Sequence, residues 1–171
     1  VTIDTLRPDH VSFGGYQRPT TPFLEAKAKK GVVFSHAYAP SSWTPLSMGS
    51  LFTSLYPRSH GVTYSAWGTA KNFPRPVLSD TFTTLAERLK QAGYTTVGVP
   101  ANVHLSSALG FSQGFDVYLE RSPMLSAEKL NDQVRRKLEQ ALGPDWRTSW
   151  RNQKLFLWIH YLDPHSPYNP Y

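Results

Sequence analysis

Polar side chains able to bind a cation or to act as a nucleophile follow each predicted strand of this sequence. Asp4 comes directly after the first apolar segment, and a run ending in Thr44 follows the second. The later strands are followed by two further groups, Asn102 with His104, and His160 with Asp163 and His165. In parallel α/β sheets, ligands bind beyond the carboxyl ends of the strands. Four such strand ends together predict one polar site at that edge of the sheet.

The hydroxyl of Thr44 lies at the expected start of a helix over residues 45–55. The free N–H groups at a helix N-terminus favour an anion such as phosphate or sulfate. The same field lowers the cost of forming an alkoxide, which makes Thr44 a candidate nucleophile that a metal would activate further. A threonine in this place also serves as a simple helix cap. Its position alone leaves both roles open.

Asp4 is the candidate metal ligand, because hard cations bind through carboxylate oxygens. An aspartate after a strand also caps turns, and its position alone leaves both roles open. Asn102 and His104 are two residues apart, so on an extended chain their side chains face the same side. A single histidine such as His104 is also a common hydrogen-bonded loop residue.

The other histidines show no metal-binding pattern. His160 and His165 are five residues apart, which is not a known zinc spacing such as His-Glu-x-x-His. The remaining three, His10, His36 and His60, are expected to be structural.

Strands and helices alternate along the chain. Apolar runs predict strands over residues 1–3, 32–34, 95–99 and 155–159, and apolar periodicity predicts helices over residues 21–30, 45–55, 81–92 and 126–142. On the second helix the apolar stripe is Met48, Leu51, Phe52 and Leu55. Residues 57–80 and 100–125 are expected to be irregular. This order predicts an α/β fold with a mostly parallel central sheet flanked by helices on both faces.

The composition excludes several classes of protein. The chain has 171 residues, 40% of them hydrophobic, so it can bury a core. With no cysteine it has neither a disulfide scaffold nor a thiolate metal site. No apolar run approaches the roughly 18 residues of a membrane span. The net charge of +6 is spread out, and its densest cluster, 135–137, is expected to be a solvated helix face rather than a nucleic-acid site.

Several ordered motifs resemble one known family. The segments are 4–10, 20–24, 31–34 with 37–39, 42–47, 50–57 with 60–62, 85–89 with 92–96, 110–116, and 156–168. Together they look like the amino-terminal part of the sulfatase family, which belongs to the alkaline phosphatase superfamily. The resemblance covers nearly the whole sequence in order, and it implies an alkaline-phosphatase-like α/β fold.

The resemblance implies a role for each candidate residue. Asp4 matches the first metal-ligand aspartate, and Thr44 matches the nucleophile, which also contacts the metal. Asn102 falls where typical sulfatases carry a lysine near the sulfate, which implies substrate binding. His104 matches the histidine that contacts the nucleophile. His165 matches the histidine that reaches the substrate anion or the leaving oxygen.

The sequence also departs from the family pattern. Typical sulfatases convert a cysteine or serine to formylglycine, and a threonine at position 44 cannot give that aldehyde, so no formylglycine is expected. The proline and arginine places of the signature hold Leu46 and Met48. A second acid often follows the first aspartate, and here that place holds Thr5. Met48 in particular removes a positive charge beside the nucleophile.

What the resemblance implies is a metal-dependent hydrolase that cleaves a small anionic sulfate ester through Thr44. The expected cofactor is a divalent cation, Ca²⁺ ahead of Mg²⁺ or Mn²⁺. Alternatives are a phosphodiesterase or phosphoethanolamine-type transferase, and a non-catalytic family member acting as a binding module. Residues 1–171 are expected to be the amino-terminal part of one catalytic domain, with further metal ligands beyond Tyr171. The family resemblance implies a periplasmic or secreted protein.

Overall fold

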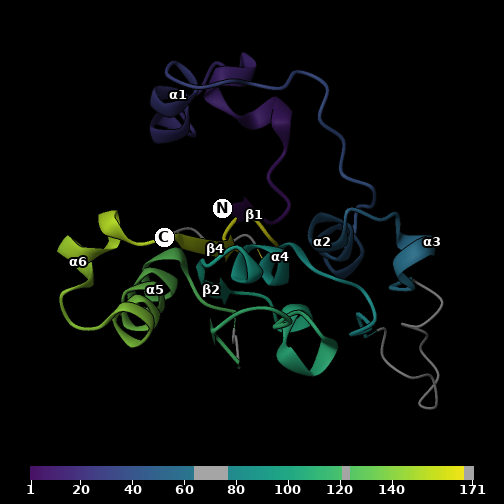
Figure 1. Cartoon of the computed structure of the whole chain (residues 1–171). Helices are drawn as coiled ribbons and strands as arrows, with labels where there is room; N and C mark the ends of the chain where they lie inside the picture. Colours follow the sequence, from purple (N-terminus) through teal and green to yellow (C-terminus); the bar gives the residue numbers. More distant parts are fainter. Residues whose placement is uncertain (64–76, 121–123, 168–171) are drawn as a thin grey trace.

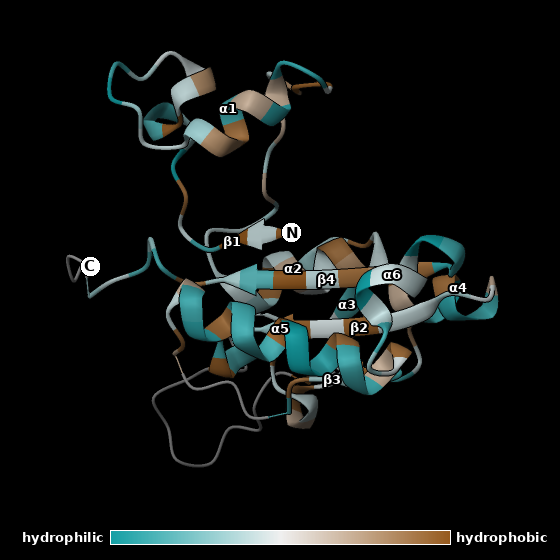
Figure 2. Cartoon of the chain, turned by 90° about the vertical axis from the view of Figure 1, so that its left-hand side faces the viewer, coloured by the Kyte–Doolittle hydropathy of each residue, from teal (hydrophilic) through white to brown (hydrophobic). Residues whose placement is uncertain are grey.

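The computed structural model describes residues 1–63, 77–120 and 124–167. Within these residues, four strands form one parallel sheet in the order β1-β4-β2-β3 (Figures 1 and 2). Their bounds are β1 (Thr2–Ile3), β2 (Thr95–Pro100), β3 (Val117–Tyr118) and β4 (Leu155–Tyr161). The predicted α/β fold with a parallel sheet flanked by helices is confirmed.

The register of the sheet sets which residues meet at its carboxyl edge. β2 pairs with β4 along its whole length, ending at Pro100 opposite His160. β1 pairs with β4 at two positions, where Thr2 lies opposite His160 and Ile3 lies opposite Tyr161. Because all strands are parallel, the residues that follow β1, β4 and β2 leave the sheet at the same edge.

One face of the sheet is covered by α5 (Ala127–Leu142) (Figures 1 and 2). Its buried side chains recur at four-residue steps, as the sequence predicts, and these are Leu130, Val134 and Leu138. They pack against Val97, Val99 and Ile159 of the sheet. The first turn of α5 is anchored from a distance, because Asp163 Oδ1 accepts the N–H of Ala127 at 2.8 Å.

The other face packs against α2 (Thr44–Thr53) and α4 (Leu85–Gln91). Phe52 of α2 meets the Trp158 ring of β4 edge-on, with centroids 4.8 Å apart. Trp158 and Ile159 thus face opposite sides of the sheet, as successive strand residues must.

His60 is a buried structural histidine at the end of α3 (Pro57–His60), as the sequence predicts. Its Nδ1 accepts the N–H of Val62 at 3.2 Å, so Nε2 carries the hydrogen and donates it to Ser50 Oγ at 3.0 Å. Gly49 of α2 lies directly against the imidazole. Burial lowers the pKa of His60, against backbone contacts that raise it.

A small helical lobe, residues 8–30, lies beyond β1, the edge strand of the described sheet (Figures 1 and 2). It comprises η1 (Pro8–His10), η2 (Ser12–Gly14) and α1 (Pro22–Ala28). Thr21 precedes α1 as predicted, but its hydroxyl accepts the N–H of Ser12 at 2.9 Å rather than capping the helix. At its other end α1 stops at Ala28, before the predicted end at residue 30.

The predicted strand over residues 32–34 is wrong. Val32 and Phe34 are 82% and 78% exposed, and no strand is assigned there among the described residues. β-branched and aromatic residues favour strands because they pack on a half-buried pleated surface. Here the segment lies outside the sheet, so that packing is missing.

Several element bounds also differ from the predictions. α4 begins at Leu85 rather than near residue 81, because Thr84 and Glu87 form a reciprocal capping box. The apolar stripe on α2 is partly wrong, since Leu51 and Leu55 are exposed and the buried positions are Pro45, Leu46, Gly49 and Phe52. Short elements were not predicted, namely α3, β3, η4 (Val103–Leu105), η5 (Ser107–Leu109), α6 (Trp146–Ser149) and η6 (Trp150–Asn152). Part of the predicted 57–80 loop, residues 64–76, lies outside the described residues.

Candidate active site

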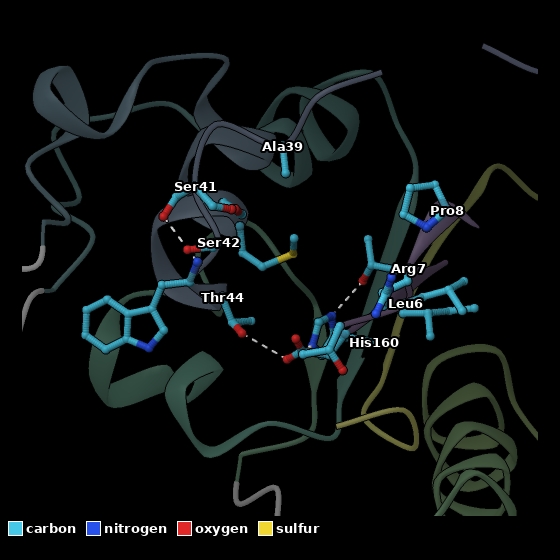
Figure 3. Close-up of a pocket in the computed structure, with 15 residues that line it drawn as sticks. Leu6, Arg7, Pro8, Ala39, Ser41, Ser42, Thr44 and His160 are labelled. Atoms are coloured by element: carbon cyan, nitrogen blue, oxygen red, sulfur yellow. Dashed lines mark hydrogen bonds and ion pairs between the residues drawn. The ribbon is translucent and has the colours of Figure 1, made fainter. Parts of the chain in front are cut away.

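Asp4 is the centre of the site at the carboxyl edge of the sheet. Its N–H donates to the Tyr161 carbonyl at 2.8 Å, which continues the pairing of β1 with β4 by one residue. Three side chains donate to its Oδ2 atom: Thr44 Oγ1 at 2.9 Å, Asn102 Nδ2 at 2.9 Å and His160 Nε2 at 3.2 Å. Figure 3 shows Thr44 pointing toward this carboxylate from the start of α2.

The surroundings of Asp4 keep its carboxyl group ionised. Burial raises its pKa, since only 9% of its side chain is exposed. The hydrogen bonds from His160, Thr44 and Asn102 outweigh burial and hold the pKa of Asp4 at about 2. At neutral pH the site therefore contains a fixed negative charge that accepts hydrogen bonds from three different elements.

Thr44 occupies the first residue of α2, one residue earlier than predicted. Trp43 takes the cap position and its side chain makes no capping hydrogen bond. The Thr44 hydroxyl donates to Asp4 instead of accepting a helix N–H, so the cap-only interpretation does not describe it. Pro45 follows directly and has no N–H, which leaves this helix end with fewer free donors than the sequence argument assumed.

Thr44 and Asp4 open into a pocket of about 380 Å³ between β1 and the start of α2 (Figure 3). The lining comprises Thr2, Ile3, Asp4, Thr5, Leu6, Arg7, Pro8, Ala39, Ser41, Ser42, Trp43, Thr44, Ser47, Met48 and His160. Met48 presents a thioether here, as its place in the sequence implies. Arg7 brings a cation to the rim, where its guanidinium is paired with Asp9 at 2.6 Å. The sequence argument did not anticipate this arginine.

The backbone bends sharply as it leaves Asp4. Thr5 has a φ of +51°, a left-handed conformation that a β-branched residue seldom adopts. Such conformations cost on the order of 1–3 kcal/mol and collect at functional sites. Thr5 is exposed and lines the pocket, so the bend places it beside the carboxylate that precedes it.

The other predicted site residues are placed differently. Asn102 is buried and held at both ends, because its Nδ2 donates to Asp4 while its Oδ1 accepts the N–H of His104 at 2.9 Å. The His104 ring lies edge-on to Trp43, with centroids 6.4 Å apart. His165 lies in the turn after β4, with its Nδ1 2.6 Å from the carbonyl of Ser166. As far as the described residues go, the pocket lining includes neither His104 nor His165.

His160 is the site residue that the sequence argument left out. It was noted only as one of several polar residues after a strand, and its spacing from His165 gave no metal pattern. Its place in the site follows from the strand register, which the sequence does not give. The parallel pairing of β1 with β4 puts His160 beside Thr2, two residues before Asp4. His160 is buried and its Nε2 lies 3.2 Å from Asp4 Oδ2.

Comparison with known proteins identifies the family. The Sulfatase family model matches residues 1–171. This chain belongs to the sulfatase family. The N-acetylgalactosamine-6-O-sulfatase of Bacteroides thetaiotaomicron is 28% identical over 181 aligned positions, which cover 91% of this chain and 34% of that protein.

Two solved structures of low sequence identity have the same fold. The phosphonate monoester hydrolase of Agrobacterium radiobacter superposes with a TM-score of 0.65 at 20% identity, covering 97% of this chain and 40% of the other. The C-terminal periplasmic domain of EcEptC from Escherichia coli, in complex with Zn, gives 0.61 at 21% identity, covering 98% and 43%. Both support the alkaline-phosphatase-like fold. The present sulfatase-family chain spans about a third to two fifths of the length of these relatives.

The donor set of the site is of the right type for a divalent cation but supplies only some of the ligands. Asp4 offers an ionised carboxylate and Thr44 a hydroxyl, both oxygen donors of the kind that Ca²⁺ and Mg²⁺ bind. The side-chain hydrogen bonds of Asp4 within the described residues all end on Oδ2. Across the described part of the chain, no three His, Asp or Glu side chains come together as a metal site. In those same residues, no helix is long and apolar enough to cross a bilayer.

Proposed function

We propose that this sulfatase-family protein is a metal-dependent hydrolase that cleaves a sulfate ester with Thr44 as its nucleophile. One observation carries the proposal. The Thr44 hydroxyl lies in a pocket at the carboxyl edge of the sheet, 2.9 Å from an ionised Asp4. That edge is where α/β folds bind ligands. The sulfatase from Bacteroides thetaiotaomicron supports a sulfate ester as the substrate class.

In this proposal Asp4 orients the nucleophile rather than acting as its base. The Thr44 hydrogen points to Asp4 Oδ2, so the lone pairs of Thr44 Oγ1 point elsewhere, toward a substrate in the pocket. Because its hydrogen bonds hold its pKa well below the usual range, Asp4 stays ionised at neutral pH and is a poor acceptor for the proton of Thr44. Asp4 therefore holds the hydroxyl in position while the proton passes to solvent.

The bond changes follow from this arrangement. Thr44 Oγ1 attacks the sulfur of the ester, forming a Thr44–sulfate bond as the sulfur–oxygen bond to the alcohol breaks. The family resemblance assigns protonation of the leaving oxygen to His104 or His165, which would have to reach it from the segments after β2 and β4, outside the described lining of the pocket. Water then attacks the sulfur of the covalent ester, releasing sulfate and restoring the Thr44 hydroxyl.

A divalent cation held by Asp4 and Thr44 would lower the pKa of the hydroxyl and neutralise the charge of the substrate. Ca²⁺ is the expected ion, since both donors are hard oxygens. Two protein ligands are fewer than the six to eight that Ca²⁺ takes, so the proposal places further ligands outside residues 1–171. In keeping with the chain's share of its relatives' length, residues 1–171 are then the amino-terminal part of one catalytic domain.

The test compares turnover of an aryl sulfate and an aryl phosphodiester by the full-length protein, with and without added Ca²⁺. Thr44→Ala is expected to lower turnover by about three orders of magnitude or more, because it removes the nucleophile. Thr44→Ser keeps a hydroxyl and should retain part of the activity. Thr53→Ala is the matched control, because Thr53 lies in the same helix and its hydroxyl bonds the Gly49 carbonyl and the Leu55 N–H, outside the lining of the pocket in the described residues. Equal turnover in Thr44→Ala and Thr53→Ala would refute the nucleophile assignment.

A second candidate function is hydrolysis or transfer of a phosphorus ester. The fold shared with the phosphonate monoester hydrolase of Agrobacterium radiobacter favours it. An unmodified threonine as the nucleophile also suits this chemistry, whereas Met48 in the arginine place of the sulfatase signature supports a non-catalytic family member. Faster turnover of the phosphodiester than of the sulfate would establish this alternative. Turnover of neither substrate, together with no cation uptake, would support a non-catalytic binding module.

A further inference from the structure

A buried chain of hydrogen bonds continues from Asp4 back into the sheet. His160 Nε2 lies 3.2 Å from Asp4 Oδ2, and His160 Nδ1 lies 2.8 Å from Thr2 Oγ1. Trp158 Nε1 lies 3.1 Å from the same Thr2 oxygen. Thr2 and Asp4 flank Ile3 on β1, so they point to the same face of the sheet, and Thr2 is the direct neighbour of His160 across the strands.

The direction of each hydrogen bond is argued from which of its two groups can donate a hydrogen and which can accept one. An indole N–H is only a donor, so Thr2 Oγ1 accepts from Trp158. The single hydroxyl hydrogen of Thr2 then has two acceptors in range, His160 Nδ1 at 2.8 Å and the Ile159 carbonyl at 3.4 Å. The shorter and better bond is to the imidazole. This favours Nδ1 of His160 as the acceptor over the other arrangement, in which Thr2 Oγ1 accepts from both rings and donates to the Ile159 carbonyl.

The same logic fixes the other ring nitrogen. If Nδ1 accepts, the hydrogen of a neutral imidazole sits on Nε2. The group that faces Nε2 is the carboxylate of Asp4, which can only accept. In this series of hydrogen bonds each donor thus faces an acceptor, from Trp158 through Thr2 and His160 to Asp4.

We propose that Thr2 and Trp158 are positioning residues that hold His160 as the Nε2–H tautomer, so that His160 fixes the orientation of Asp4. The proposal deepens the proposed function, since it concerns the carboxylate that orients Thr44. A hydrogen bond to one ring nitrogen of a histidine fixes its tautomer and the orientation of its ring, and here Thr2 makes that bond to His160. Trp158 is itself immobilised by the aromatic rings packed around it, those of Phe52 at 4.8 Å and Phe115 at 6.0 Å.

Nitrogen NMR of the full-length, ¹⁵N-histidine-labelled protein without added metal tests the proposal directly. The ¹⁵N shifts and long-range proton couplings of an imidazole separate the two neutral tautomers from the imidazolium. His160 is identified by the signal that disappears in His160→Gln. We expect the Nε2–H tautomer in the wild type and in Thr2→Ser, which keeps the hydroxyl. We expect Thr2→Val to lose it, because valine has the same shape but no hydroxyl.

Two further variants keep the test decisive. Thr95→Val makes the same substitution on β2, away from His160, and should leave the tautomer unchanged. Thr2→Val leaves the buried indole N–H of Trp158 without its acceptor and could prevent folding. In that case Thr2→Val combined with Trp158→Phe removes both partners of the Trp158–Thr2 hydrogen bond. An Nδ1–H tautomer or an imidazolium in the wild type would overturn the proposal, as would an Nε2–H tautomer that persists in Thr2→Val.

Calorimetric titration with Ca²⁺ separates this inference from the proposed function. Loss of a partner bonded directly to a ligand lowers metal affinity by about 10–100-fold. Thr2 acts on Asp4 through His160, so Thr2→Val should bind Ca²⁺ up to about tenfold more weakly than Thr2→Ser. Equal affinities would argue against the positioning role. Absence of Ca²⁺ binding by the wild type would instead refute the proposed function, while the tautomer measurement would still decide the inference.

Discussion

Replacing Gly49 by alanine tests the packing of α2 against His60. On an exposed helix the change would stabilise the protein by about 1 kcal/mol, because alanine has the higher helix propensity. Here the new Cβ would lie 2.9 Å from His60 Cε1 and 3.2 Å from each ring nitrogen. Carbon atoms in good contact are about 3.5–4.0 Å apart. The ring would therefore have to shift by several tenths of an ångström.

That shift is opposed from both sides of the ring. His60 donates to Ser50 Oγ at 3.0 Å and accepts from the Val62 N–H at 3.2 Å, so displacement lengthens at least one bond. Losing a buried hydrogen bond costs about 1–3 kcal/mol, and overpacking a core costs about as much. After the propensity gain is subtracted, Gly49→Ala should destabilise the protein by about 2 kcal/mol.

Urea unfolding of the purified protein measures this free energy, and a double-mutant cycle isolates its cause. In the background of His60→Ala the imidazole is gone, so Gly49→Ala should be neutral or stabilising by up to about 1 kcal/mol. The interaction energy of the cycle should then be about 2–3 kcal/mol. A higher unfolding midpoint for Gly49→Ala alone would refute the reasoning, since it would mean that the ring yields without loss.

Three other predictions concern single contacts. Burial lowers the folded-state pKa of His60, so its contribution to stability is present above about pH 6.5 and is lost as the pH falls further. His60→Gln should therefore flatten the pH dependence of the unfolding free energy between about pH 7 and 5. Thr84→Ala removes half of the α4 capping box and should cost about 1 kcal/mol in urea unfolding, whereas Thr81→Ala outside the helix should cost little. Asp163→Ala removes the acceptor of the Ala127 N–H and should speed amide hydrogen exchange there, while an unchanged rate would show that the first turn of α5 is held by other contacts.

The helices and strands that could be predicted are those whose own apolar pattern shows which of their side chains are buried. α5 was predicted closely, because its leucines and Val134 repeat at helical spacing and face a single sheet. β4 was predicted because a long apolar run suits a strand covered on both faces. The segment at residues 32–34 has the same local preference but no strand beside it, so propensity alone gave the wrong answer.

The site residues that could be predicted are those that directly follow a strand or precede a helix in the sequence. Asp4, Thr44 and Asn102 were each selected for their place after a strand or before a helix, and the structure brings them together. His160 was not selected, because its role depends on which strand lies beside β4, and the sequence does not state the strand order. The missing N–H at the start of α2 could have been predicted, because the sequence places Pro45 directly after Thr44.

The hydrogen bonds of Asp4 also bear on when the site can form. They span 40, 98 and 156 positions of the sequence, and the longest of them joins the first strand to the last. At about 5–20 residues per second, a ribosome takes about 8–30 s to pass from Asp4 to His160. During that time β1 has been synthesised but its neighbour in the sheet has not. The full set of hydrogen bonds on Asp4 can therefore form only after His160 has been synthesised, and β1 stays without its partner β4 until then.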